Sequence, residues 1–227
     1  MSDEHEMQRH KKWLWGYLSA MAVLLLVATF SKMNRLTTNP RSRVITVQRL
    51  VDDDTWSHAT PNDTTPLALS IDAVQEEGRL YSSMPPIFPG LMALQSMGVK
   101  AVTGMGGYDH LVDHLRVLVI VNQVFPYLLM LWMAFHFLQR YTSDPWTLAF
   151  MMLALGPGML AFGYAVTINN HTPAAVLYMV AFFLVDRLSV DQQRPYILYA
   201  LVGLMTGFAF AFELPSGGMA MWRLLWL

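Results

Sequence analysis

The chain has 227 residues, of which 54% are hydrophobic and only 14% charged, and its formal net charge is −1. Soluble domains carry about a quarter charged residues, so this composition and its long uncharged stretches indicate a polytopic membrane protein. The balanced charge gives no electrostatic footprint for nucleic acid. Because the chain contains no cysteine, disulfides, cysteine metal sites and cysteine nucleophiles are excluded.

The first uncharged stretch covers residues 13–31, between Lys12 and Lys32, and is long enough to cross a bilayer. A signal peptide is the alternative, because Lys11 and Lys12 precede the stretch. The apolar run is longer than a signal core, however, and no small-x-small cleavage site follows it cleanly. We therefore expect residues 1–12 to form a cytoplasmic tail and residues 13–31 to form the first span.

Four further spans follow from the same criterion, at residues 116–139, 145–166, 172–187 and 195–212. The sequence "GPG" at Gly156–Gly158 should break or bend the third of these spans, and Pro126 should kink the second. A sixth span would begin within 216–227, where the sequence stops without a polar flank, so we expect a truncated chain. The predicted fold class is an all-α transmembrane bundle of five to six spans.

The short loops set the expected orientation. Lysine and arginine occur in the N-terminal tail, at Arg140 and in "DRLSVDQQR", whereas the alternate links "TINNHT" and "ELPS" carry neither. The positive-inside rule therefore places the N terminus in the cytoplasm. Residues 32–115 then form a long extracytoplasmic loop, since long loops translocate largely regardless of their charge.

Two amphipathic helices are expected in this loop. In "NPRSRVITVQRLVDDDTW", Val44, Val47 and Leu50 recur at helical spacing, with Arg43 and Arg49 on the polar side. The apolar stretch 86–99 is too short to span and should lie along the outer membrane surface or pack on the bundle, with Tyr81 at the polar boundary. Between them, "SIDAVQEEG" predicts a short helical turn that ends at Gly78.

These residues resemble a family. An outside first loop with a tryptophan, then Gly-x-x-Tyr, then a Pro-Pro pair entering an apolar helix is similar to the GT-C membrane glycosyltransferases, in the bacterial branch with the aminoarabinose and mannosyl-type transferases. The resemblance covers roughly residues 1–215 and thus the N-terminal portion of such an enzyme. The matching positions are Trp56, Gly78, Tyr81, Pro85, Pro86 and Leu91.

The resemblance implies transfer of a sugar from a polyprenyl-phosphate carrier to an acceptor outside the membrane. A loop carboxylate acts as base on the acceptor hydroxyl, and basic residues, sometimes with a divalent metal, hold the phosphate. Arg43 and Arg49 are the candidates for the phosphate. The sequence departs from the family at Asn39-Pro40, where an acidic pair is usual, and at Met84, where lysine or histidine is frequent.

If the chain is active, another acid must supply the base. The resemblance leaves Asp72 and the run Asp52, Asp53, Asp54 as candidates, of which one at most would act. The alternative for the run is a solvated helix end, because charge runs usually face solvent. A divalent metal among three adjacent acids is conceivable. The alternative for Asp72 is a helix surface.

Polar residues near the spans complete the expected cavity. Asn169, Asn170 and His171 in "TINNHTP" are candidates to contact a sugar or phosphate, against the alternative that Asn170 or Thr172 caps the next helix. Glu213 lies at the outer membrane face, where a carboxylate is costly unless paired or hydrated, so it is a site candidate, against the alternative of a simple interface residue. Asn122 and Gln123, inside a span, are expected either to form interhelical hydrogen bonds or to bind a ligand.

Three functions remain open. The first is a glycosyltransferase-like protein that uses a polyprenyl-phosphate sugar, with Tyr81 lining its cavity. The second is a non-catalytic relative that binds a lipid-linked glycan or scaffolds a membrane complex, which the replacement at Asn39-Pro40 favours. The third is a transporter. The "GPG" break favours it, because transporters often contain broken helices, but the sequence shows no matching internal repeat.

Overall fold

The computed structural model describes residues 2–32, 38–58, 72–104, 111–190 and 195–213. The described chain is mostly helical, with a single small hairpin among those residues. Three helical stretches are long and apolar enough to cross a membrane: His10–Ser31, Leu111–Leu138 and His171–Leu188. The expected start of a sixth span at 216–227 lies outside the described residues.

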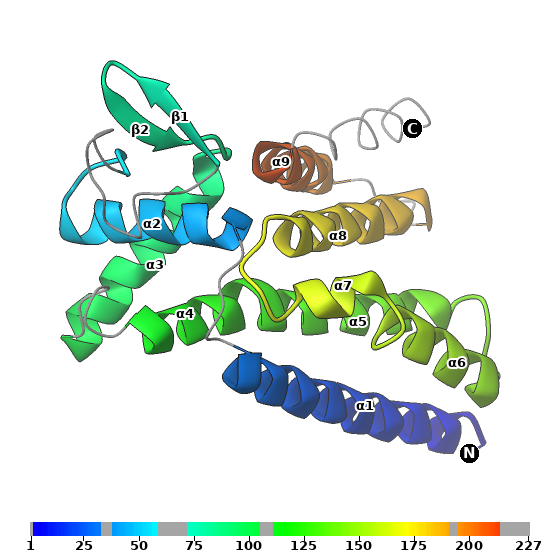
Figure 1. Cartoon of the computed structure of the whole chain (residues 1–227). Coiled ribbons are helices and arrows are strands. Elements are labelled where there is room, and N and C mark those ends of the chain that lie inside the picture. Colours follow the sequence, from blue (N-terminus) through cyan, green and yellow to red (C-terminus); the bar gives the residue numbers. More distant parts are fainter. Residues whose placement is uncertain (1, 33–37, 59–71, 105–110, 191–194, 214–227) are drawn as a thin grey trace.

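The long helices lie side by side (Figure 1). Helix α1 (Ser2–Lys32) continues through the residues expected to be a tail. It packs beside α5, and helices α8 (His171–Val190) and α9 (Tyr196–Phe212) pack against each other. At the end of the bundle where α1 begins, Arg140 after α5 forms an ion pair with Asp186 of α8.

The central long helix changes its winding partway along. It runs through α4 (Leu111–Val119), a π-helical turn (Ile120–Val124) and α5 (Phe125–Leu138). The Phe125 amide donates to the Ile120 carbonyl, five residues earlier, instead of the usual four. Pro126 follows at once and has no amide hydrogen to donate. The irregularity expected at Pro126 is therefore a local π turn.

The glycine-proline-glycine break appears as the sequence predicts. Helix α6 (Pro145–Leu155) begins at Asp144, whose carboxylate accepts a hydrogen bond from the Thr147 amide at 2.7 Å. It ends at Gly156, and the short helix α7 (Leu160–Tyr164) follows. A Cβ added at Gly156 would lie 1.9 Å from the Tyr17 hydroxyl of α1, so glycine permits this close approach.

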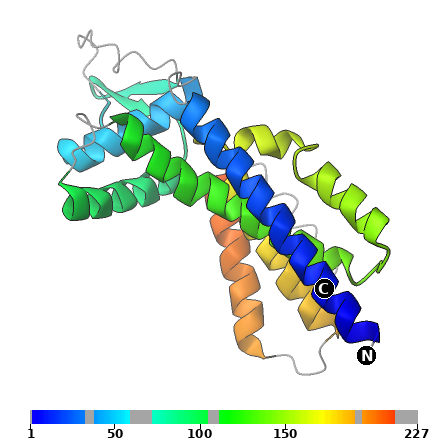
Figure 2. The ribbon, with the colours of Figure 1, turned by 90° about the horizontal axis from the view of Figure 1, so that it is seen from below.

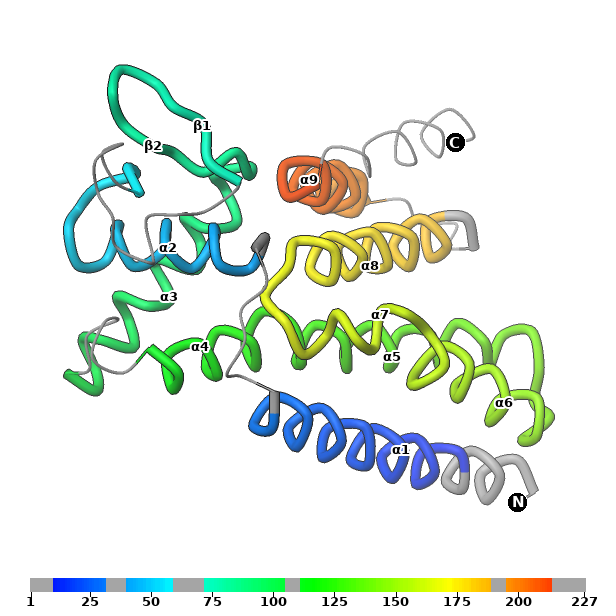
Figure 3. The backbone as a smooth tube through the Cα atoms, viewed as in Figure 1, coloured from blue at the N-terminus to red at the C-terminus, as the bar shows by residue number. Residues whose placement is uncertain are grey.

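Residues of the long first loop gather at the opposite end of the bundle (Figures 1 and 2). They form α2 (Thr38–Asp52), strands β1 (Ala73–Glu76) and β2 (Arg79–Ser82), and α3 (Ile87–Thr103). Helix α2 packs on α3, with Val44 and Val47 buried as the helical spacing predicts. The backbone trace shows the ends of α8 and α9 that face this group (Figure 3).

The expected helical turn ending at Gly78 is wrong, because β1 and β2 form an antiparallel hairpin there. Glu76 pairs with Arg79 across a two-residue turn. Both turn residues have positive φ, 48° at Glu77 and 74° at Gly78, which is the conformation of the type I′ turn that matches the strand twist. The small sheet is an addition to the expected all-α class.

Helix α3 has apolar residues on two sides. Phe88, Met92 and Ala93 are buried against the rest of the protein, whereas Leu91 and Leu94 are exposed. The half-exposed Trp56 ring lies over the first turn of this helix, since a Cβ added at Gly90 would be 3.4 Å from it. The tryptophan and the proline-rich entry of α3 thus belong to one packed unit.

Candidate functional site

Helix α2, the hairpin and α3 together form what we call the first-loop unit. Its most unusual side chain is that of Arg43, which is only 4% exposed. The expectation that it lies on the polar side of α2 is wrong, because its side chain points toward the bundle. Its guanidinium donates a hydrogen bond to Asn170 Oδ1 at 2.6 Å and contacts Met84 Sδ at 3.5 Å. Among the described residues, no carboxylate lies within ion-pair distance of it.

Carboxylates nevertheless surround this cation at longer range. Burial lowers the pKa of Arg43 below its ordinary value, whereas Asp72 and Glu213 raise it. The guanidinium stays positively charged, because arginine is not deprotonated in proteins. A buried cation with only neutral direct partners is costly, and such groups are enriched at functional sites.

Asn170 joins three elements at this point. Its Oδ1 accepts from Arg43 of α2, and its Nδ2 donates to the carbonyl of Phe212, at the end of α9, at 2.8 Å. Asn170 itself precedes α8. The capping role expected of Asn170 or Thr172 belongs to Asn169, whose Oδ1 accepts from the Thr172 amide at 2.9 Å.

His171, the first residue of α8, lies next to Asn170 in the chain and forms a hydrogen bond with Glu213. Its Nδ1 is 2.6 Å from Glu213 Oε1, and the two side chains are 49% and 21% exposed. The Tyr164 ring meets the imidazole edge to face, with ring centroids 5.4 Å apart. The structure therefore brings together four candidates from distant parts of the sequence: Arg43, Asn170, His171 and Glu213.

A buried amide network holds the loop before α8 in place. Gln123, on the π turn, donates to the Asn169 carbonyl at 2.7 Å and accepts from Asn169 Nδ2 at 3.0 Å. Asn122 and Gln95 of α3 form a reciprocal amide pair. Of the two expectations for Asn122 and Gln123, interhelical hydrogen bonding is the one that the structure shows.

Asp72 belongs to the same region as Arg43. Its backbone carbonyl accepts from the Ser83 amide at 3.0 Å and from the Ser42 hydroxyl at 3.3 Å, which ties the hairpin to α2. Its carboxylate oxygen Oδ2 is buried without a hydrogen bond. Tyr81, by contrast, is half-buried in β2 opposite Val74.

The acidic run lies at the other end of α2. Asp52 follows Arg43 by nine residues on the same helix, which places it about 14 Å farther along the axis. Asp52 forms an ion pair with Lys100 of α3 at 2.7 Å, and Asp53 pairs with Arg49 at 2.6 Å. Asp54 is exposed, with a positive φ of 52°. These acids therefore lie at the C-terminal end of α2, away from Arg43.

The same contacts argue against a divalent metal at the acidic run. Two of the three acids are engaged by cations, and no group of three or more histidine, aspartate or glutamate side chains in the described ranges could share an ion. The run Asp52–Asp54 therefore does not fit a metal site.

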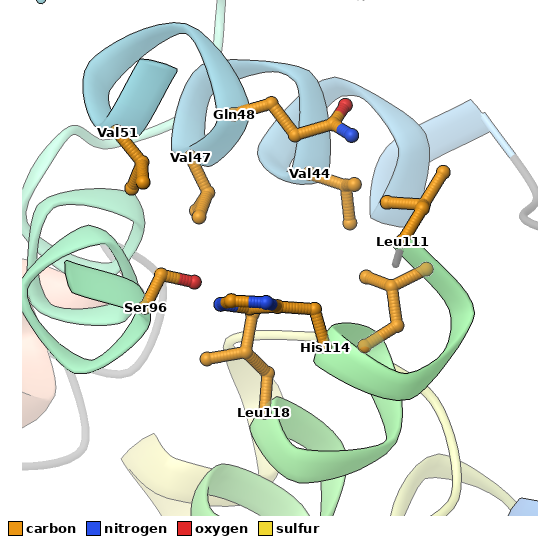
Figure 4. A pocket seen from close by; sticks show the side chains of 9 residues that line it. Val44, Val47, Gln48, Val51, Ser96, Leu111, His114 and Leu118 are labelled. Atoms are coloured by element: carbon orange, nitrogen blue, oxygen red, sulfur yellow. The ribbon is translucent and has the colours of Figure 1, made fainter. Parts of the chain in front are cut away.

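A separate pocket lies between α2, α3 and α4 (Figure 4). Its lining is largely aliphatic, with Gln48, Ser96 and His114 as polar exceptions. The Ser96 hydroxyl and both ring nitrogens of His114 are buried and have no hydrogen-bond partner in the ranges that the structure describes. Its volume is only about 10 Å³, room for one water molecule. It is too small for a sugar or a phosphate.

Sequence reasoning missed two contributors to the site, Ser42 of α2 and Ser82 of β2, whose hydroxyls share a hydrogen bond of 2.8 Å. Met84, noted in the sequence only as a departure from the family, contacts the Arg43 guanidinium. Comparisons of the whole chain with family models, with curated proteins and with solved structures found no match.

Proposed function

We propose that this chain is a membrane glycosyltransferase-like protein that transfers a sugar from a polyprenyl-phosphate carrier to an acceptor on the extracytoplasmic side. The observation that carries the proposal is the Arg43 guanidinium, buried where α2, α8 and α9 meet, whose direct partners within the described part of the chain are all neutral. A departing phosphate gains negative charge, and a fixed cation in a site of low dielectric constant stabilises that charge.

The proposal includes five spans. They are α1, the α4–α5 helix, the α6–α7 pair, α8 and α9, of which α6 and α9 are shorter apolar helices. The end with Arg140 and Asp186 faces the cytoplasm of a bacterial inner membrane, and the end with α2, α3 and the hairpin faces outward. This topology puts Arg43 on the side where polyprenyl-phosphate sugars are consumed in the family that the sequence resembles.

The outer surface of α3 supports a lipid-linked donor. Leu91, Leu94 and Met97 are exposed on this helix, although its other side is already buried. An exposed apolar helix face beside a transmembrane bundle suits the interface between headgroups and acyl chains. A polyprenyl chain could lie in the bilayer next to α3 while its phosphate reaches toward α2.

The test is sugar transfer by the full chain in membranes, with radiolabelled polyprenyl-phosphate hexoses and pentoses as donors. We expect Arg43→Gln to lower the transfer rate by about 100-fold or more, because one preorganised charge is lost. Arg43→Lys keeps the charge but not the planar fork and should retain part of the rate. Arg79→Gln, at an exposed arginine of the hairpin, is the matched control. Absence of transfer by the unaltered chain would refute the proposal.

One observation favours a second function. Asn39 and Pro40 replace the acidic pair usual in the resembled family, so the chain could bind a lipid-linked glycan or scaffold a membrane complex without chemistry. Saturable binding of labelled donor that Arg43→Gln abolishes, without any transfer, would identify this function. A transporter remains the less favoured third function.

A further inference from the structure

The His171–Glu213 pair has the geometry of a carboxylate-oriented base. Nδ1 of the imidazole faces Glu213 Oε1 at 2.6 Å. An imidazole that donates its Nδ1 hydrogen to a carboxylate keeps the lone pair of Nε2 for a proton from another molecule. The ring is held in a second direction by Tyr164, so its orientation is defined from two sides.

The pair is also the accessible part of the polar site. The His171 side chain is 49% exposed, whereas Arg43 is 4% exposed. Asn170, which accepts the hydrogen bond from the Arg43 guanidinium, is the residue directly before His171. Consecutive residues at the start of α8 therefore bring a buried cation and an exposed imidazole into one site.

The carboxylates expected to act as base are less suited to the task. Asp52 and Asp53 form ion pairs at the far end of α2 from Arg43, and the exposed Asp54 follows them directly in the chain. One carboxylate oxygen of Asp72 is buried, where an acceptor hydroxyl has no approach. A general base must come within hydrogen-bond reach of the proton that it takes, and His171 is the exposed base nearest in sequence to the Arg43 contact.

We propose that His171 is the general base of the transfer reaction and that Glu213 is the residue that positions it. This inference rests on the glycosyl transfer proposed above. His171 Nε2 takes the proton of the acceptor hydroxyl while the acceptor oxygen bonds to the anomeric carbon. The bond from that carbon to the phosphate oxygen breaks, and polyprenyl phosphate leaves with the electron pair, its charge stabilised by Arg43. The proton then passes from His171 to water.

The experiment compares His171→Ala and Glu213→Gln in the full chain, in membranes, with the radiolabelled polyprenyl-phosphate sugar that the unaltered chain uses. We expect His171→Ala to lower kcat about 100-fold or more with little change in the donor KM. Added imidazole should restore kcat, since the side chain it replaces is exposed. Glu213→Gln should lower kcat less, and the same imidazole should not restore it.

Asp113→Asn is the matched control, because it also neutralises one acid of an exposed ion pair, with Arg116 of α4. Unchanged kcat in His171→Ala, or a loss that imidazole does not restore, would overturn the base assignment and leave the transferase proposal standing. Restoration by imidazole distinguishes a chemical role from a structural one. No transfer by the unaltered chain would overturn both proposals together.

Discussion

Replacing Asn170 with alanine removes both bonds of the amide that joins α2, α8 and α9. The Arg43 guanidinium loses its only oxygen acceptor among the described residues, and the Phe212 carbonyl loses the Asn170 donor. A hydrogen bond to a charged group contributes about 1.5–3 kcal/mol, and a neutral one about 0.5–1.5 kcal/mol. We therefore expect Asn170→Ala to lower the free energy of unfolding by about 2–4 kcal/mol.

A double-mutant cycle separates the pair from its surroundings. Arg43→Met removes the charge but keeps an unbranched apolar stem, so the double variant with Asn170→Ala no longer buries a cation without an acceptor. We expect the double variant to be less destabilised than the sum of the single variants, by about 1–3 kcal/mol. Reversible unfolding of the purified protein in mixed micelles, followed by tryptophan fluorescence, measures each variant.

Two results would contradict this reasoning. One is a loss below about 0.5 kcal/mol for Asn170→Ala, which is the range of an exposed surface substitution. The other is strict additivity in the cycle, which would mean that the guanidinium and the amide are not energetically coupled. Thr167→Ala is the control, because Thr167 is an exposed residue of the same connection and its hydroxyl bonds only the nearby Tyr164 carbonyl.

Three further results are expected from the fold. Gly156→Ala should lower the free energy of unfolding by about 1–3 kcal/mol through its clash with the Tyr17 hydroxyl. Adding Tyr17→Phe to this variant should recover part of the yield of monodisperse protein in size-exclusion chromatography. His114→Leu should leave stability unchanged or raise it by about 1 kcal/mol, because both ring nitrogens are buried without partners among the described residues; a large loss in the same unfolding assay would contradict this. Burial, with a smaller effect of Arg49, lowers the pKa of His58 to about 4. The unfolded chain thus takes up a proton near pH 6.5 that the folded chain does not, and stability present above that pH should fall by roughly 3 kcal/mol toward pH 4, a slope that His58→Gln should flatten.

Much of the helical layout follows from local sequence chemistry. Asp144 begins α6, the glycines at 156 and 158 end it, and α9 occupies Tyr196–Phe212, within one residue of the stretch predicted from charge-free length. These features depend on residues close together in the chain. The hairpin at Glu77-Gly78 was missed because glutamate is an unusual first residue for a turn with two positive φ angles.

The polar site was predictable in its members but not in its arrangement. Arg43, Asn170, His171 and Glu213 stand out as polar residues beside apolar stretches, yet helical spacing assigned Arg43 to solvent. Its burial depends on an acceptor more than a hundred residues away, which no local pattern contains. Conversely, the acidic run is conspicuous in sequence, but the rise of one helix separates it from Arg43.

The π turn at Ile120–Val124 rotates the apolar face of the long helix between its first half and its second half. One additional residue in a helical turn rotates everything beyond it by about 100° around the axis. Helix α4 can therefore direct its apolar face at α3, while α5, on the same continuous helix, directs its own at α1 and α8. In a relative whose helix lacks one residue of this segment, α4 and α5 would lose this rotation of their apolar faces relative to each other. Such a relative could keep the packing of α4 on α3 or the packing of α5 in the bundle, and would need different side chains at the other contact.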